Sequence, residues 1–264
     1  MLKGALHVHS VYSDGDLTLG ELRDRFLRAG CDFACVTDHA DAFDQARVRE
    51  YERECTTLSD ERFRFVPGLE FGCVRRMHIV GYGVTALADS DEPQQVIDHI
   101  ARAGGVSVIA HPASHAFEWI ETFQTLPDGV ETWNAKYDGR YAPRPATFAL
   151  VRRLQLRRPD VRAFYGIDLH WRTQFAGLFT LVNAVDASHS AILSALARGA
   201  FVGLKDDLEL PSSGELSEAL LAHFGRIHGR SQRIRTLLKS MSRTISRAGA
   251  TIPAPVKAQL RRLF

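Results

Sequence analysis

The chain has 264 residues, of which 45% are hydrophobic and 24% are charged, a composition typical of a soluble globular protein with a large core. No apolar run approaches the ~18 residues that a membrane span needs, and no charged-then-apolar leader opens the sequence, so we expect neither a transmembrane segment nor a secretory signal. The four cysteines form no paired CxxC motifs and are expected to be free thiols in a reducing cytoplasm.

The net charge of +2 conceals an uneven distribution along the chain. Residues 215–264 contain ten Lys or Arg and two acids, whereas residues 1–214 contain 23 basic and 29 acidic residues. Pro211-Ser-Ser-Gly214 is typical of a loop and separates the two parts. We therefore expect an acidic domain over residues 1–210 and a basic helical extension over residues 211–264.

Short strand-like and longer helix-like segments alternate through the acidic domain. A first strand at 5–8 is followed by the capping box Thr18-Leu-Gly-Glu21, which predicts a helix that ends near residue 29. Further strands are predicted at 33–37, 63–71, 77–82, 106–110, 129–132, 161–165, 178–182 and 200–204. Further helices are predicted at 44–58, 93–102, 114–123, 145–157 and 189–198. Strands separated by helices favour a parallel sheet, and this number of units indicates an α/β barrel.

Six histidines and three acids fall at the carboxyl ends of these predicted strands or just beyond them. They are His7, His9, Asp14, His39, Glu70, His78, His111, Asp168 and His170. Residues two apart on a strand point to one face, so His7 with His9, and Asp168 with His170, can each share a metal ion. Because the carboxyl ends of barrel strands form the active-site face, we expect all nine groups to converge there.

Nine imidazole and carboxylate groups at one place indicate metal binding. Nitrogen and oxygen donors without cysteine favour Zn, Mn or Fe, and nine ligands suit two or three ions better than one tetrahedral site. A single histidine at a strand end is usually structural. The ordered combination of HxH, TDH, an isolated Glu, HP and DxH is hard to obtain by chance.

The motifs HVHSVYSDG, TDHAD, GLEF, MHIVGYG, AHP and GIDLH, in this order, resemble the PHP (polymerase and histidinol phosphatase) superfamily of metal-dependent phosphoesterases. The resemblance covers about residues 1–205 and implies a distorted (β/α)7 barrel with a trinuclear metal centre. By the family pattern, one ion is held by His7, His9, Glu70 and Asp168. A second is held by Asp14, His39 and His170, and a third by His78 and His111 with Glu70 as a bridge.

Clustered cations generate a metal-bound hydroxide at neutral pH and bind the non-bridging oxygens of a phosphoryl group. We therefore predict hydrolysis of phosphate esters, with Glu70, Asp168 and His170 in catalytic roles and a small phosphorylated metabolite as substrate. The alternatives are a nuclease that acts on nucleic-acid ends and a metal-binding regulatory protein without turnover. The sequence leaves the oligomeric state open.

A phosphate substrate also calls for cationic side chains. Lys136, Arg140 and Arg144 follow the strand at 129–132, and Arg172 follows the GIDLH motif, so these four residues are candidates for substrate binding. Trp133 or Tyr137 could stack on a base or ring, or both could be structural. Ala113-Ser114 follows the HP step where nucleotide-phosphatase-like relatives usually carry Gly-Arg, which argues against nucleotide monophosphates.

The basic extension has apolar residues at helical spacing, with arginine and lysine on most other faces. These apolar residues are Ile227, Ile234, Leu237, Leu238, Met241 and Ile245. The favoured interpretation is a helix that packs this stripe on the acidic barrel. The alternative is a surface that binds nucleic acid or anionic lipid.

Overall fold

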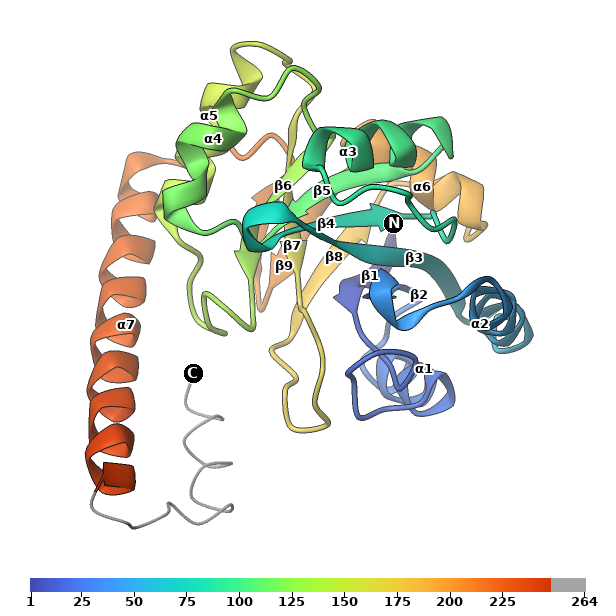
Figure 1. The fold of residues 1–264 in the computed structure, drawn as a ribbon, viewed down its shortest axis with the longest axis horizontal. Coiled ribbons are helices and arrows are strands. Elements are labelled where there is room, and N and C mark those ends of the chain that lie inside the picture. Colours follow the sequence, from blue (N-terminus) through green and yellow to red (C-terminus); the bar gives the residue numbers. More distant parts are fainter. Residues whose placement is uncertain (248–264) are drawn as a thin grey trace.

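The computed structural model describes residues 1–247, and its strands form one ten-stranded sheet in the order β10-β9-β8-β1-β2-β3-β4-β5-β6-β7 (Figure 1). The strands are β1 (Leu2–Val8), β2 (Phe33–His39), β3 (Arg64–Cys73), β4 (Met77–Tyr82), β5 (Val106–Ala110), β6 (Gly129–Asn134), β7 (Arg162–Gly166), β8 (Leu178–Val182), β9 (Phe201–Lys205) and β10 (Leu208–Pro211). The helices are α1 (Leu19–Arg28), α2 (Gln45–Thr57), α3 (Pro93–Arg102), α4 (Phe117–Glu121), α5 (Pro145–Gln155), α6 (His189–Ala197) and α7 (Glu218–Arg247).

The chain beyond β7 returns to β1 and closes the first seven strands into a barrel. The backbone N–H of Ile167 donates to the carbonyl of Leu6 at 2.9 Å, and the N–H of His9 donates to the carbonyl of Leu169 at 2.9 Å. At the other end of β1, residues 2–4 pair instead with β8, so β8, β9 and β10 fill the space where β1 and β7 diverge. The predicted (β/α)7 barrel is confirmed.

One expectation about strand direction is wrong. Strand β4 runs antiparallel to both β3 and β5, and β8, β9 and β10 also pair antiparallel, so the sheet is mixed rather than parallel. Only Val74–Arg76, a short 3-10 turn, separates β3 from β4, and so short a connection permits only antiparallel pairing. His78 therefore lies at the beginning of its strand, opposite Gly72 near the end of β3.

Helix α7 packs on the barrel near its amino terminus and then extends past it (Figure 1). Phe224 is buried with its ring centroid 6.0 Å from that of Trp133, whereas Ile234 and Leu237 are exposed. The side chains of Met241 and Ile245, and residues 248–264, lie outside the described part of the chain. No helix within residues 1–247 combines the length and hydrophobicity required to span a bilayer.

Candidate metal centre

The nine histidines and acids singled out from the sequence meet at one end of the barrel. His7 lies in β1, His39 ends β2, Glu70 lies in β3 and His78 lies in β4. The other five follow strands: His9 and Asp14 come after β1, His111 after β5, and Asp168 and His170 after β7. Parallel strands bring their carboxyl ends to this face, and β4 contributes its beginning because it runs the opposite way.

Glu70 stands at the centre of the group and is 1% exposed. Five imidazole nitrogens surround its two oxygens: Nε2 of His7 and of His9 at 3.2 Å and Nδ1 of His39 at 3.3 Å from Oε2, Nδ1 of His78 at 2.9 Å and Nε2 of His111 at 3.1 Å from Oε1. One carboxylate thus connects two sets of imidazoles, an arrangement suited to bridging two cations.

Asp14 and Asp168 complete the cluster on the side of His170. Asp14 Oδ1 lies 3.2 Å from His170 Nε2 and 3.6 Å from His39 Nε2. Asp168 Oδ1 lies 3.1 Å from His170 Nδ1 and 3.7 Å from His9 Nε2. Asp168 is buried whereas the side chain of Asp14 is 56% exposed, so the Asp14 side of the cluster faces solvent.

Potential ligand atoms form four overlapping groups, each with all its atoms within 4.8 Å of one another. The groups are His9, Asp14, His39 and His170; His7, His9 and Asp168; His7, Glu70 and His111; and His39, Glu70 and His78. Residues His7, His9, His39 and Glu70 each belong to two groups, so the groups share candidate ligands and are not separate sites.

Three buried polar atoms in the cluster have no hydrogen-bond partner. They are His7 Nε2, His9 Nε2 and Asp168 Oδ1. An unsatisfied buried polar atom is costly, so such atoms signal a missing partner. Two imidazole nitrogens and a carboxylate oxygen that point into one cluster are the donor set that a divalent transition metal takes, so these residues fit metal ions.

The backbone is strained at three of the nine positions. The φ angles of His7, His111 and Asp168 are 61°, 29° and 48°, in a region that residues other than glycine rarely adopt. A β-bulge interrupts the pairing of β1 with β2 between Ala5 and Val8, next to His7. Such conformations cost about 1–3 kcal/mol each and persist at functional sites where the surrounding structure enforces them.

The charges of the cluster shift the pKa values of its members strongly. Burial favours the neutral imidazole of His7, but Glu131, Glu70 and Asp168 outweigh burial and raise its pKa well above the usual value. Burial lowers the pKa of His9 to about 3. Although burial opposes ionisation of Glu70, nearby histidines hold its pKa well below the usual value. Glu70 is therefore charged and His9 is neutral, the states that metal binding requires, whereas the raised pKa of His7 means that metal binding at its Nε2 displaces a proton.

Glu131, a residue that the sequence analysis missed, supports two of the candidate ligands from behind. It is fully buried in β6; its Oε1 accepts a hydrogen bond from His7 Nδ1 at 2.7 Å and its Oε2 accepts one from the backbone N–H of His111 at 2.9 Å. Asn134 Nδ2 donates to Glu131 and to Asp168. With its Nδ1 proton held by Glu131, His7 directs Nε2 into the cluster.

Asp38 plays a similar part beneath the loop that carries Asp14. This buried carboxylate accepts four hydrogen bonds, from the backbone N–H and the hydroxyl of both Ser10 and Ser13. The serines of the HSxxSDG motif thus fix the loop. In the sequence, Asp38 and Glu131 are each a single acidic residue within a largely apolar strand, and this pattern could have identified both.

Of the four candidate substrate-binding cations, Lys136 contacts the cluster. Its Nζ lies 2.9 Å from His170 Nε2 and 3.5 Å from Asp168 Oδ1. Arg144 instead pairs with Asp138 and donates to the carbonyl of Pro112, which ties two loops together. The Arg140 guanidinium lies 5.4 Å from the centre of the Tyr141 ring.

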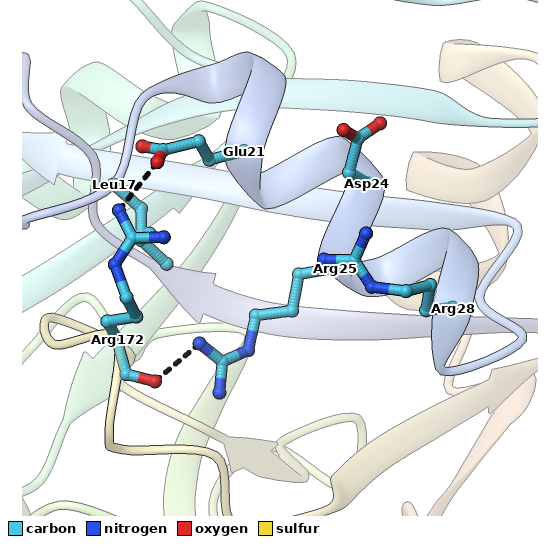
Figure 2. A pocket seen from close by; sticks show the side chains of 6 residues that line it. All are labelled: Leu17, Glu21, Asp24, Arg25, Arg28 and Arg172. Carbon is cyan, nitrogen blue, oxygen red and sulfur yellow. Dashed lines mark hydrogen bonds and ion pairs between the residues drawn. The ribbon is translucent and has the colours of Figure 1, made fainter.

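Arg172 lines a small pocket of about 350 Å³ against α1 (Figure 2). Its guanidinium pairs with Glu21, and its carbonyl accepts a hydrogen bond from Arg25. Figure 2 shows the Arg172 side chain turned toward the start of the helix. Trp133 is also not a stacking surface: it is 1% exposed, and its indole N–H donates to the carbonyl of Gly139.

A cleft of about 1060 Å³ opens beside the cluster. Its lining includes the candidate ligands Asp14, His39 and His78, three further aspartates (Asp41, Asp89 and Asp91), and the apolar side chains of Phe43, Phe71 and Leu87. Among the described residues that line it there is no lysine or arginine. This side of the cluster is therefore acidic.

Comparison with known proteins gives concordant matches. The PHP domain family matches residues 5–139. The DNA polymerase/3'-5' exonuclease PolX of Bacillus subtilis is 30% identical over 77 residues, a match that covers 26% of this chain and only 14% of PolX.

Two solved structures share the fold. A two-domain protein of Bacteroides vulgatus that contains a predicted PHP-like metal-dependent phosphoesterase has 18% identity and a TM-score of 0.55. The match covers 79% of this chain and 66% of that chain. PsfC of Pseudomonas syringae has 13% identity and a TM-score of 0.52, with 90% and 98% covered. Seven of the nine candidate ligands lie within the matched residues 5–139, and this chain belongs to the PHP domain family.

Proposed function

We propose that this protein hydrolyses the phosphate ester of a small metabolite at a centre of two or three divalent transition-metal ions, Zn, Mn or Fe. The observation that carries the proposal is the convergence of nine imidazole and carboxylate groups, with Glu70 at their centre and with three buried ligand atoms that have no hydrogen-bond partner. Bound ions would supply Lewis acidity toward water and toward the phosphoryl oxygens. In the reaction, water adds to phosphorus, the ester P–O bond breaks and the leaving oxygen takes a proton.

The protein's own groups have distinct tasks in this reaction. Glu70, Asp168 and His170 hold the centre in place, and the Lys136 ammonium, 3.5 Å from Asp168 Oδ1, is positioned to bind a phosphoryl oxygen as negative charge develops. The side chain of Asp14 is 56% exposed, on the solvent-facing side of the centre. Arg144 and Arg172 are weaker candidates because their guanidinium groups pair with Asp138 and Glu21 instead. Arg140 remains a candidate from its position in the loop after β6.

A nuclease is the less favoured alternative. Asp41, Asp89 and Asp91 line the cleft beside the cluster, and they would repel the successive phosphates of a polynucleotide. A small monoester places its phosphoryl group at the cluster and does not extend along these three aspartates.

The test is a substrate panel with metal analysis. We would assay p-nitrophenyl phosphate and its bis ester, sugar phosphates, histidinol phosphate, nucleotides and single-stranded oligonucleotides, each with Mn, Zn and Fe. We expect two to three ions per chain and monoester hydrolysis that is lost on chelation and regained on metal addition. One ion or fewer would refute the cluster, and a fully loaded protein without turnover on any ester would favour the regulatory alternative.

A further inference from the structure

Two exposed aromatic rings flank Lys136 at the mouth of the metal centre. The Lys136 Nζ lies 5.5 Å from the centre of the Tyr137 ring and 5.6 Å from that of the Trp171 ring. Tyr137 is 47% exposed and Trp171 is 38% exposed, although aromatic rings of this size are usually buried. Both rings are thus partly exposed beside the Lys136 ammonium, which reaches the cluster.

Both rings are kept in place by contacts with candidate ligands or with residues that position those ligands. The centroid of the Tyr137 ring lies 4.3 Å from that of the His111 imidazole, and the backbone N–H of Tyr137 donates to Asn134 Oδ1. Trp171 directly follows His170, with ring centroids 5.7 Å apart. The Gln174 side chain fixes this second loop, because it accepts from the His170 N–H and donates to the Asp168 carbonyl. The two rings are therefore positioned in advance of binding, which lowers the entropic cost of binding a ligand.

The distribution of charge around the cluster gives the ester an orientation. The cleft beside His39 and His78 has three aspartates beyond Asp14, whereas the Lys136 ammonium lies next to His170 and within 5.6 Å of the centres of both rings. An anionic phosphoryl group is attracted toward Lys136. The organic group attached to it then meets Tyr137 and Trp171.

We propose that Tyr137 and Trp171 form an aromatic subsite that selects phosphate monoesters with a flat ring near the ester oxygen. The proposal rests on the phosphoesterase function above and adds the chemical class of the substrate. A ring that packs on both faces gains on the order of tenfold in affinity from each of them.

Ligands matched in size and in leaving group isolate the contribution of the ring. We would measure the binding of 2-phenylethylphosphonate and of 2-cyclohexylethylphosphonate to the metal-loaded protein by calorimetry. In parallel, kcat/KM would be measured for the corresponding phosphate esters, whose alkoxide leaving groups are similar. We expect wild type to prefer the phenylethyl compounds, and Tyr137→Ala and Trp171→Ala each to reduce the aromatic-to-aliphatic affinity ratio about tenfold. Tyr137→Phe and Trp171→Phe should retain most of the ratio.

Tyr141 supplies the matched control. It is 53% exposed in the same loop, and its ring lies against the Arg140 guanidinium and not against Lys136. Tyr141→Ala should leave the ratio unchanged. An equal preference of wild type for both phosphonates, or a ratio that neither alanine variant changes, overturns the subsite. Selective phosphonate binding without hydrolysis of either ester supports the subsite and refutes the phosphoesterase function instead.

Discussion

Replacement of Glu131 by glutamine changes one oxygen for an NH2 group at the point where β6 supports the metal centre. The carboxylate accepts hydrogen bonds on both oxygens, from His7 Nδ1 on one side and from the His111 N–H and Asn134 Nδ2 on the other. Glutamine has one acceptor oxygen. Whichever way its amide turns, an NH2 group faces a donor.

The first orientation directs the NH2 group at His7. It then donates to Nδ1, which moves the imidazole proton to Nε2, the atom that must stay unprotonated to bind a metal. In the other orientation the NH2 group faces the His111 N–H and Asn134 Nδ2. These buried donors are then left without an acceptor, at a cost of about 1–3 kcal/mol each. Loss of such a supporting carboxylate typically reduces metal affinity about 10–100-fold, or about 1.4–2.7 kcal/mol.

The assay is a metal titration against a competing chelator, together with urea unfolding. Glu131→Gln should bind metal about 10–100-fold more weakly than wild type. The control is Asp128→Asn, directly before the first residue of β6, where Asp128 accepts hydrogen bonds from Ser107 and pairs with Arg158. That variant should lose stability but keep its metal affinity. Wild-type metal affinity in Glu131→Gln, with a stability loss equal to that of Asp128→Asn, would refute the tautomer argument.

Three further changes test neighbouring parts of the structure. Gly166→Ala would place a methyl group 1.8 Å from Glu131 Oε1, so it should displace the carboxylate and reproduce the metal loss of Glu131→Gln in the same chelator titration. Glu70→Gln should lose metal and activity together, because a neutral amide cannot bridge two cations, while His99→Ala should keep both; an active Glu70 variant would contradict the assignment. Phe224→Ala should destabilise the protein by about 3 kcal/mol in urea unfolding, because this buried ring joins α7 to the barrel, and an unchanged midpoint would show that α7 is not required for the fold.

The strand-end pattern predicted the composition of the cluster because parallel strands deliver their last residues to one face, whatever the details of packing. It misjudged His78, since the direction of β4 depends on how short the preceding connection is. Sequence spacing also could not separate Lys136 from Arg144. Both residues follow β6 in one loop. Only the three-dimensional structure shows that Arg144 pairs with Asp138 whereas Lys136 reaches Asp168. The sequence also left the role of Trp133 open between stacking and structure, and the packing of α7 against it decides for a structural role.

The antiparallel turn between β3 and β4 also has a consequence for the order of folding. Glu70 and His78 meet through a local hairpin, which forms on a microsecond timescale without the rest of the barrel. His7 and Asp168 come from opposite ends of the barrel sequence and meet only when the chain beyond β7 pairs with β1, a non-local contact that pays a larger loop-closure entropy. The half of the site around Glu70 and His78 is therefore formed early. The half around His7 and Asp168 is completed last, so acquisition of tight metal binding during refolding reports closure of the barrel.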